Sequence, residues 1–271
     1  MMRMATTVTQ REMNGTGMRS VEPWFVAMAI VRRDVLGMVR QPIRLAAALG
    51  TPVLLWLFLA SGFSRVVAGG EGEGAIGYPG FVLPGVMTLV AVFSTIFASI
   101  NLIDERNTGW LRAVLISPSP RWSIAMGKLM GGAVIGWGQA VLLLPAVWVI
   151  GPTPPWWGVL VSVAVLFLTC LAVAGLGLNF AWRAESTASF HAVMNLVFLP
   201  MWLLSGAIIP FETAAGWFAA VMWINPLTWC THAIRAPLLG EFPLMAVVGT
   251  IAFAGLMVSL VVVQMRRPLP V

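Results

Sequence analysis

Charged residues are scarce in this sequence, and the scarcity argues against a soluble globular domain. Asp, Glu, Lys and Arg together make up 10% of the 271 residues, while 59% are apolar. Soluble domains carry about 25% charged and about 45–50% apolar residues. The alternation of apolar and polar residues that is typical of membrane barrels is also missing, so helices remain as the spanning form. We therefore predict an all-α polytopic membrane protein.

Motifs for nucleotide binding, metal binding and hydrolysis are missing as well. The Gly127–Lys128 pair has Trp122 where a P-loop needs its first glycine, and leucine follows the lysine. The histidines, His191 and His232, have no ligand-type partner at metal-binding spacing. H-E-x-x-H and G-x-S-x-G sequences are absent, which disfavours a membrane protease. We expect no catalytic residue, no metal site and no cofactor bound by this chain.

Six apolar runs are long enough to cross a bilayer. A hydrocarbon core about 30 Å thick needs about 20 helical residues, and none of the runs has Asp, Glu, Lys or Arg in its interior. The expected spans are about 45–63, 81–103, 129–150, 156–182, 190–211 and 243–265. Together they predict a single transmembrane domain over residues 20–271, after a flexible cytoplasmic leader of residues 1–19.

The distribution of basic residues predicts the orientation. If the N-terminus is cytoplasmic, fourteen of the 16 Lys and Arg lie inside and only Arg65 and Arg235 lie outside. This matches the positive-inside bias, so both termini are expected in the cytoplasm. The basic excess then faces anionic membrane lipid, and no nucleic-acid partner is needed to explain it.

Two segments outside the spans have membrane-like patterns of their own. Residues 21–44 carry an apolar stripe that begins at Trp24, with arginines off the stripe, which predicts an amphipathic helix in the inner membrane interface. Residues 212–240 contain two half-length apolar pieces separated by Asn225–Pro226. We interpret this region as short re-entrant helices that form an outer gate.

The segment of residues 104–121 concentrates charge between the second and third runs. An apolar stripe at helical spacing begins at Trp110, and Asp104 and Glu105 are expected in the first helical turn, where the helix dipole favours anions. Pro118 is expected to end this helix. Such a segment either lies passively on the membrane or presents one face to a partner.

Three stretches resemble a known family. "DERNTGWLRAVLISPSPRWSIAMGK" resembles its segment between the second and third spans, "SGAIIPFE" the end of its fifth span, and "NPLTWCTHAIR" its signature before the last span. The family is that of the permease subunits of type-2 ABC exporters. The chain departs from its pattern at residues 107–109, where a more charged run is usual, and at Trp229.

The resemblance implies an exporter powered by a separate ABC ATPase subunit, with ATP and Mg on that partner. It also implies pairing with a second permease, as a homodimer or otherwise, in the cell inner membrane. The apolar spans suit an amphipathic drug, a lipid or a lipid-linked glycan. Two alternatives remain open: an ATP-independent channel or carrier, and a membrane-integral enzyme or assembly factor.

The resemblance also assigns roles to residues. The ATPase-coupling residues are expected to be Asp104, Glu105, Arg106, Gly109, Trp110, Leu111, Arg112, Pro118 and Arg121. The outer gate is expected at Pro210, Asn225, Pro226 and Arg235, with Arg235 as a lipid headgroup contact or an ion-pair partner of Glu212 or Glu241. His191 and Asn195 are a candidate for the translocation path, although an interhelical hydrogen bond explains that pair more simply.

Overall fold

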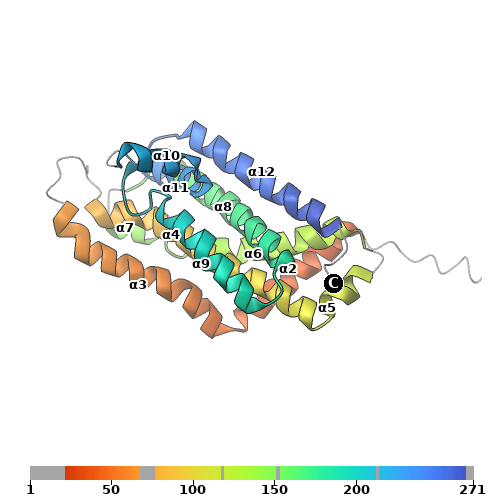
Figure 1. The fold of residues 1–271 in the computed structure, drawn as a ribbon. Coiled ribbons are helices and arrows are strands. Elements are labelled where there is room, and N and C mark those ends of the chain that lie inside the picture. The colour runs from red at the N-terminus through yellow and green to blue at the C-terminus, as the bar shows by residue number, and fades with distance from the viewer. Residues whose placement is uncertain (1–21, 68–76, 117–118, 151–152, 212–213, 267–271) are drawn as a thin grey trace, which may run out of the picture.

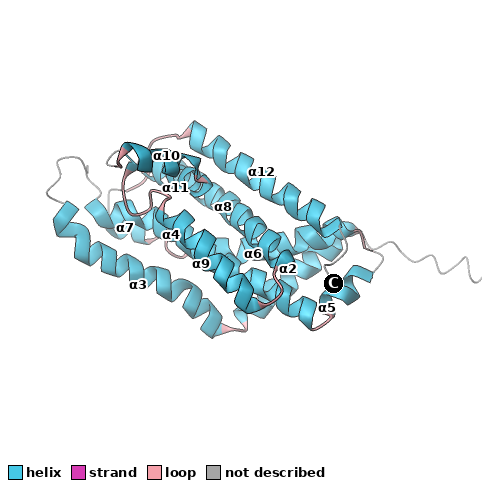
Figure 2. Ribbon diagram, in the orientation of Figure 1, coloured by secondary structure: helices cyan, strands magenta, loops and turns pink. Residues whose placement is uncertain are grey.

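The computed structural model describes residues 22–67, 77–116, 119–150, 153–211 and 214–266. Within these ranges the regular secondary structure is helical and no strand occurs, which confirms the all-α prediction (Figure 2). The helices are α2 (Pro23–Val39), α3 (Pro42–Val67), α4 (Gly77–Asn107), α5 (Trp110–Ile116), α6 (Arg121–Val141), α7 (Ala146–Ile150), α8 (Trp156–Arg183), α9 (Thr187–Leu203), α10 (Gly216–Ile224), α11 (Pro226–Leu238) and α12 (Leu244–Arg266).

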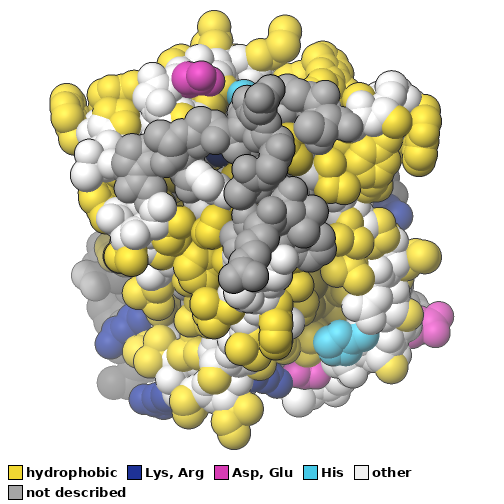
Figure 3. Space-filling model, turned by 90° about the vertical axis from the view of Figure 1, so that its left-hand side faces the viewer, with side chains coloured by type: hydrophobic (Ala, Val, Ile, Leu, Met, Phe, Trp, Pro, Cys, Tyr) yellow, Lys and Arg dark blue, Asp and Glu magenta, His cyan; other side chains and the backbone are white. Residues whose placement is uncertain are grey.

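The helices form an elongated bundle with two distinct ends (Figure 1). Helices α2 and α5 lie at one end, here called the α5 end, and α7, α10 and α11 lie at the other, here called the α10 end. Helix α4 is central and packs against α3, α6 and α8, while α3 and α12 lie on opposite edges of the bundle. Seen from the left-hand side of Figure 1, the surface is mainly hydrophobic, with most charged groups near the edges of the view (Figure 3).

Five of the described helical stretches are long and apolar enough to cross a membrane. They are Pro42–Gly62, Gly77–Asn107, Arg121–Ile150, Trp156–Arg183 and Leu244–Met265. The third stretch is interrupted because α6 ends at Val141 and α7 begins at Ala146. Pro145 lies in this turn, and proline cannot continue a helix because it lacks an N–H and clashes with the carbonyl four residues earlier.

The fifth expected span, residues 190–211, is shorter than the sequence predicted. Helix α9 has 17 residues, which span about 25 Å at 1.5 Å per residue and fall short of a hydrocarbon core. The chain then turns at Gly206, whose φ of 71° is in the left-handed region that glycine tolerates. The helix stops here because side chains of the following segment bind its last carbonyl groups, as described below.

The charged residues after the second span are also placed differently from the prediction. Asp104, Glu105 and Arg106 belong to the last turns of α4, and the expectation that the two acids begin a new helix was wrong. The break comes later, at Gly109, with a φ of 80°. No proline or glycine precedes Gly109 in this stretch, so nothing stops α4 at the end of its apolar run.

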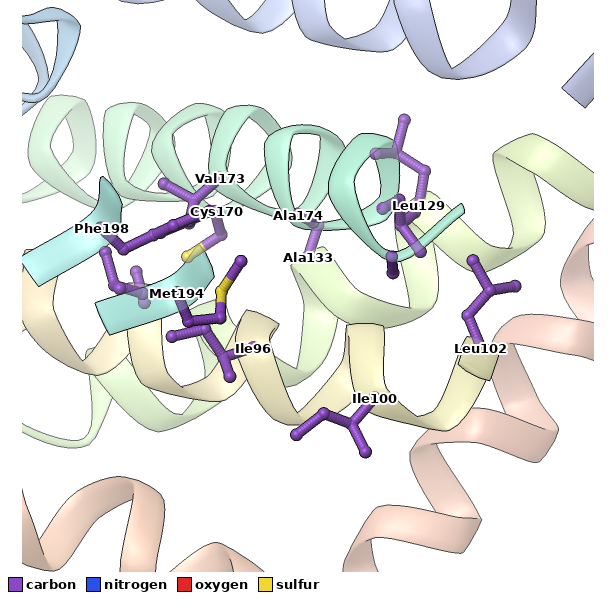
Figure 4. Close-up of a cluster of buried hydrophobic side chains, with 14 of the residues drawn as sticks. Ile96, Ile100, Leu102, Leu129, Ala133, Cys170, Val173, Ala174, Met194 and Phe198 are labelled. Atoms are coloured by element: carbon purple, nitrogen blue, oxygen red, sulfur yellow. The ribbon is translucent and has the colours of Figure 1, made fainter. Parts of the chain in front are cut away.

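Small residues allow the central helices to approach closely. A Cβ at Gly132 would lie 3.3 Å from that of Ala98 in α4 and 3.5 Å from that of Ala174 in α8. Around this contact lies a buried apolar cluster with contributions from α4, α6, α8 and α9 (Figure 4). Met194 and Phe198 of α9 reach toward Ile96 and the α8 helix in this cluster. Both cysteines, Cys170 and Cys230, are buried here as free thiols.

Candidate functional site

Three helices meet in a charge cluster, formed by Arg33 and Asp34 of α2, Glu105 of α4 and Lys128 of α6. The Lys128 Nζ lies 3.0 Å from Asp34 Oδ2 and 2.5 Å from Glu105 Oε2. The Arg33 Nη2 donates to Asp34 Oδ1 at 2.7 Å and also to Glu105 Oε1. Two cations and two carboxylates therefore connect α2, α4 and α6.

Lys128 requires this arrangement because it is buried. It is the only lysine of the sequence, and only 4% of it is exposed. A buried ammonium group is unfavourable unless it is paired and hydrogen-bonded. Gly131, one turn further along α6, leaves room for the partner: a Cβ there would lie 3.3 Å from that of Asp34. The sequence of α6 thus lets α2 come close enough for Asp34 to reach Lys128.

Helix α5 begins on top of this cluster. The guanidinium carbon of Arg33 lies 3.4 Å from the centroid of the Trp110 ring, and Lys128 Nζ lies 5.2 Å from it. Cation–π contacts of this kind stabilise by about 0.5–2 kcal/mol, depending on desolvation. Leu111, the next residue, is buried in the apolar cluster. The start of α5 is therefore fixed, whereas Ile116 at its end is 84% exposed.

Arg106 connects the end of α4, beside the charge cluster, to a fourth helix. Its guanidinium donates to the carbonyl oxygens of Trp182, at 3.1 Å, and of Ala184. These carbonyls lie at the C-terminal end of α8, where backbone acceptors have no helical partner and the helix dipole favours a cation. Arg106 thus ties the end of α4 to the end of α8.

The structure brings together Glu105, Arg106, Trp110 and Leu111 of the expected coupling residues. Asp104 is half-buried one helical position earlier, Gly109 forms the turn before α5, and Arg121 is exposed at the start of α6. The Arg112 side chain and Pro118 lie outside the described residues.

Sequence reasoning missed Arg33, Asp34 and Lys128 as partners of this site. A signal was present in α2, where Ala27, Ile30 and Met38 are buried at spacings of three and eight residues. Asp34 falls midway between Ile30 and Met38 on that face. An acidic residue on the buried face of a helix indicates that a basic residue of another helix pairs with it. The single lysine, near the start of the apolar helix α6, is that partner.

The expected outer-gate residues bind the end of α9. Asn225 Nδ2 donates to the Met201 carbonyl at 2.5 Å, and Arg235 Nη2 donates to the Gly206 carbonyl at 2.8 Å. The guanidinium of Arg235 also lies 3.8 Å from the Phe81 ring centroid. Arg235 therefore points into the bundle rather than to a lipid headgroup.

The remaining gate residues lie in the turns around α11. Pro226 is the first residue of α11, and Asn225 caps that helix by accepting the Leu227 N–H at 3.1 Å. Pro210 is half-buried in the turn after α9, and Glu212 lies outside the described residues. Side chains of Asn225 and Thr228 donate to carbonyl groups at the end of α9, which explains why α9 ends early.

His191 and Asn195 lie one turn apart on α9 and are both exposed. With Phe93 and Ile96 of α4 they line a small cavity of about 90 Å³. Neither side chain makes a hydrogen bond to another residue of the described ranges, so the expected interhelical hydrogen bond is not formed within one copy of the chain.

Comparison with known proteins agrees with this architecture. The sequence profile of ABC-2 type transporters matches residues 26–239. Nodulation protein J of Rhizobium meliloti (strain 1021) is 31% identical over 222 residues, which are 79% of this chain and 81% of that protein. The putative transport permease ycf38 of Cyanophora paradoxa is 26% identical over 208 residues, 76% of this chain and 71% of that protein.

The probable multidrug ABC transporter permease YbhR of Escherichia coli (strain K12) is 27% identical over 155 residues, 55% of this chain and 41% of that protein. The family match covers most of the chain, including α4, α5 and α6 with the charge cluster. The chain therefore belongs to the ABC-2 type transporter family and is a multi-pass membrane permease.

Proposed function

We propose that this chain is the membrane subunit of an ATP-driven exporter in the cytoplasmic membrane. A separate ABC ATPase would bind ATP and Mg, and this chain would move an amphipathic or lipid-linked substrate outward. The placement of fourteen of the 16 basic residues on one side supports cytoplasmic termini and a cytoplasmic α5 end. The name of one relative, a probable multidrug permease, supports an amphipathic substrate.

The observation that carries the proposal is the attachment of α5 to the charge cluster. A force applied to α5 reaches α2 and α4 because Trp110 rests on Arg33, which is paired with Asp34 and Glu105. It reaches α6 through Lys128, which pairs with the same two carboxylates. Arg106 extends the connection to α8. A short helix that rests on a cluster joining several longer ones is suited to transmit a partner's movement, since rigid elements and polar networks carry coupling between sites.

The ATPase is proposed to bind the exposed end of α5. Its last residue, Ile116, exposes most of its side chain, and Arg121 is exposed just beyond the following turn. An apolar contact bordered by a basic group is typical of the core and rim of a protein interface.

The second permease is proposed to pack on the α9 side. His191 and Asn195 would face lipid in a single copy, and polar groups in a membrane normally face protein or a watery cavity. Within the described residues, α9 packs mainly on α4, and its outward face, with Leu196 and Leu199, is exposed. A second copy would cover this face and place the two His191–Asn195 pairs near the interface.

The test uses two neighbouring arginines of α2. Arg33→Met removes a member of the charge cluster, whereas Arg32→Met removes an exposed arginine beside it and serves as the control. In proteoliposomes with the partner ATPase, we expect Arg33→Met to abolish most of the stimulation of ATP hydrolysis by amphiphiles. The control is expected to retain it. Equal activity of both variants would refute the coupling role, and transport without any ATPase would refute the proposed function.

A further inference from the structure

A pocket at the α10 end plays no part in the proposed coupling. It lies where α10, α11 and α12 meet and has a volume of about 330 Å³. Its lining includes Trp223, Thr228, Trp229, His232, Leu244 and Met245. Small-molecule sites have volumes of about 300–1,000 Å³ and are mostly apolar with a few polar groups. This pocket, here called the indole pocket, has both properties.

The position of the indole pocket follows from the course of α12. Leu244 and Met245 are the first residues of α12, a candidate membrane span. At the other end of α12, Gln264 donates to the Asn179 carbonyl of α8 at 3.2 Å, toward the α5 end. The pocket is lined by residues of α10, α11 and the start of α12, and these helices meet at the opposite end of the bundle from α5 (Figure 1).

The aromatic wall of the pocket is held in place by its own contacts. Trp229 Nε1 donates to the Trp223 carbonyl at 2.9 Å, and the two indole rings meet edge to face with centroids 4.6 Å apart. The Trp229 ring also lies directly on α12 at Gly249, where a Cβ would be 2.8 Å from Trp229 Cε3. A wall fixed in this way does not need to reorganise when a ligand binds, which lowers the cost of binding.

The pocket is bordered by exposed apolar side chains. Trp223 is 53% exposed, Leu244 65% and Met245 68%. The chain is a multi-pass membrane protein, so apolar side chains at the end of a span contact acyl chains. The polar groups are Thr228 and His232, of which His232 is exposed. Such an arrangement matches an amphiphile with an apolar chain beside a polar head.

We propose that the indole pocket binds one acyl chain of a phospholipid from the surrounding leaflet, with Thr228 and His232 beside its headgroup region. The pocket is too small for a helix, whose diameter is about 10–12 Å with side chains, so an interhelical protein contact does not fit it. The proposal requires only that the chain is in a bilayer and is independent of export and of the ATPase.

The test is photolabelling in vesicles of phosphatidylcholine that carries a diazirine close to the ester group of one acyl chain, at the depth of the pocket. After illumination of the reconstituted full chain, mass spectrometry locates the label. We expect the pocket residues of α10–α12 to take up roughly tenfold more label, equivalent to about 1.4 kcal/mol, than Trp156 and Leu160, which are exposed at the start of α8 at the same end of the bundle. Equal labelling of the pocket and of the start of α8 would show ordinary lipid contact and refute the proposal.

Two variants and a control decide whether the pocket itself binds the chain. Trp223→Ala removes one wall, and Leu244→Trp narrows the mouth at an exposed position; each should lower the pocket label roughly tenfold, the effect of about 1.4 kcal/mol. Trp217→Ala, an exposed tryptophan of α10 outside the pocket, should leave it unchanged. The proposal fails if all three variants label like the unaltered chain, each being monodisperse in gel filtration.

A diazirine-bearing fatty acid distinguishes the phospholipid from a single-chain amphiphile. The proposal is supported if the phospholipid probe labels the pocket and this labelling is already saturated at the phospholipid content of the vesicle. Label from the fatty acid alone, with none from the phospholipid, would overturn it.

Discussion

Lys128 shows how a single residue determines the arrangement of three helices. Its ammonium group is buried between two carboxylates that come from positions 34 and 105 of the chain. A charge at this depth selects one packing of α2, α4 and α6, because any other packing would leave it without a partner. The sequence shows the lysine, but its partners come from other helices, so their identity depends on the tertiary fold.

Replacement of Lys128 by methionine should destabilise the protein strongly. The change leaves Asp34 and Glu105 with Arg33 as their one remaining cation in the cluster. Removal of one partner of a buried ion pair costs about 3–5 kcal/mol. We expect a loss of stability of about 3 kcal/mol in reversible unfolding in detergent micelles.

A double variant tests whether this loss comes from the ion pairs. In Lys128→Met with Glu105→Gln, the remaining Arg33 and Asp34 balance each other. We therefore expect the double variant to lose at least about 1 kcal/mol less than the sum of the two single losses. Additive losses would mean that Lys128 acts through its packing alone.

At the scale of the elements, the apolar runs located the helices but not their ends. Hydropathy identified Trp156–Arg183 almost to the residue, since Pro155 and the break after Arg183 are local signals. The end of α9 depends on Asn225 and Thr228, which bind the carbonyl groups of Met201 and Leu204 from a later segment. Within residues 190–211, Gly206 marks the turn that follows, but no pattern there reveals these partners. The same holds for α5, whose start is defined by contacts with α2 and α6.

Close contact between helices predicts opposite effects for two glycine substitutions. A Cβ at Gly175 of α8 would lie 2.8 Å from the Met257 Cβ of α12, whereas nothing lies within 4 Å of one at Gly138 of α6. We expect Gly175→Ala to destabilise by about 1–3 kcal/mol through overpacking. Gly138→Ala should be neutral or should stabilise by up to about 1 kcal/mol, because alanine favours the helix.

Thermal unfolding in one detergent measures both glycine variants. The comparison isolates the α8–α12 contact, since both substitutions add the same methyl group to a helix. A similar shift of the unfolding temperature in the two proteins would show that α8 and α12 are not in close contact.

At the scale of the whole molecule, the two long edges of the bundle differ. The α12 edge exposes apolar side chains such as Leu256 and Val263, which suit lipid. The face with α9 also exposes His191 and Asn195, and α9 is too short to span the bilayer alone. The sequence predicted that His191 and Asn195 form a polar pair on one helix. The structure shows that both side chains are exposed on the outer face of that helix.

This asymmetry predicts where a second copy binds. With copper phenanthroline as oxidant, we expect Asn195→Cys to form a disulfide-linked dimer in native membranes, because a two-fold contact on α9 brings together those identical positions of the two copies that lie near the symmetry axis. Leu256→Cys on α12, an exposed position on a helix other than α9, is the matched control and should not form this crosslink. The native cysteines are buried and contribute little background. Crosslinking through Leu256→Cys but not Asn195→Cys would move the interface to the α12 edge, and the polar pair would then need another partner within the membrane.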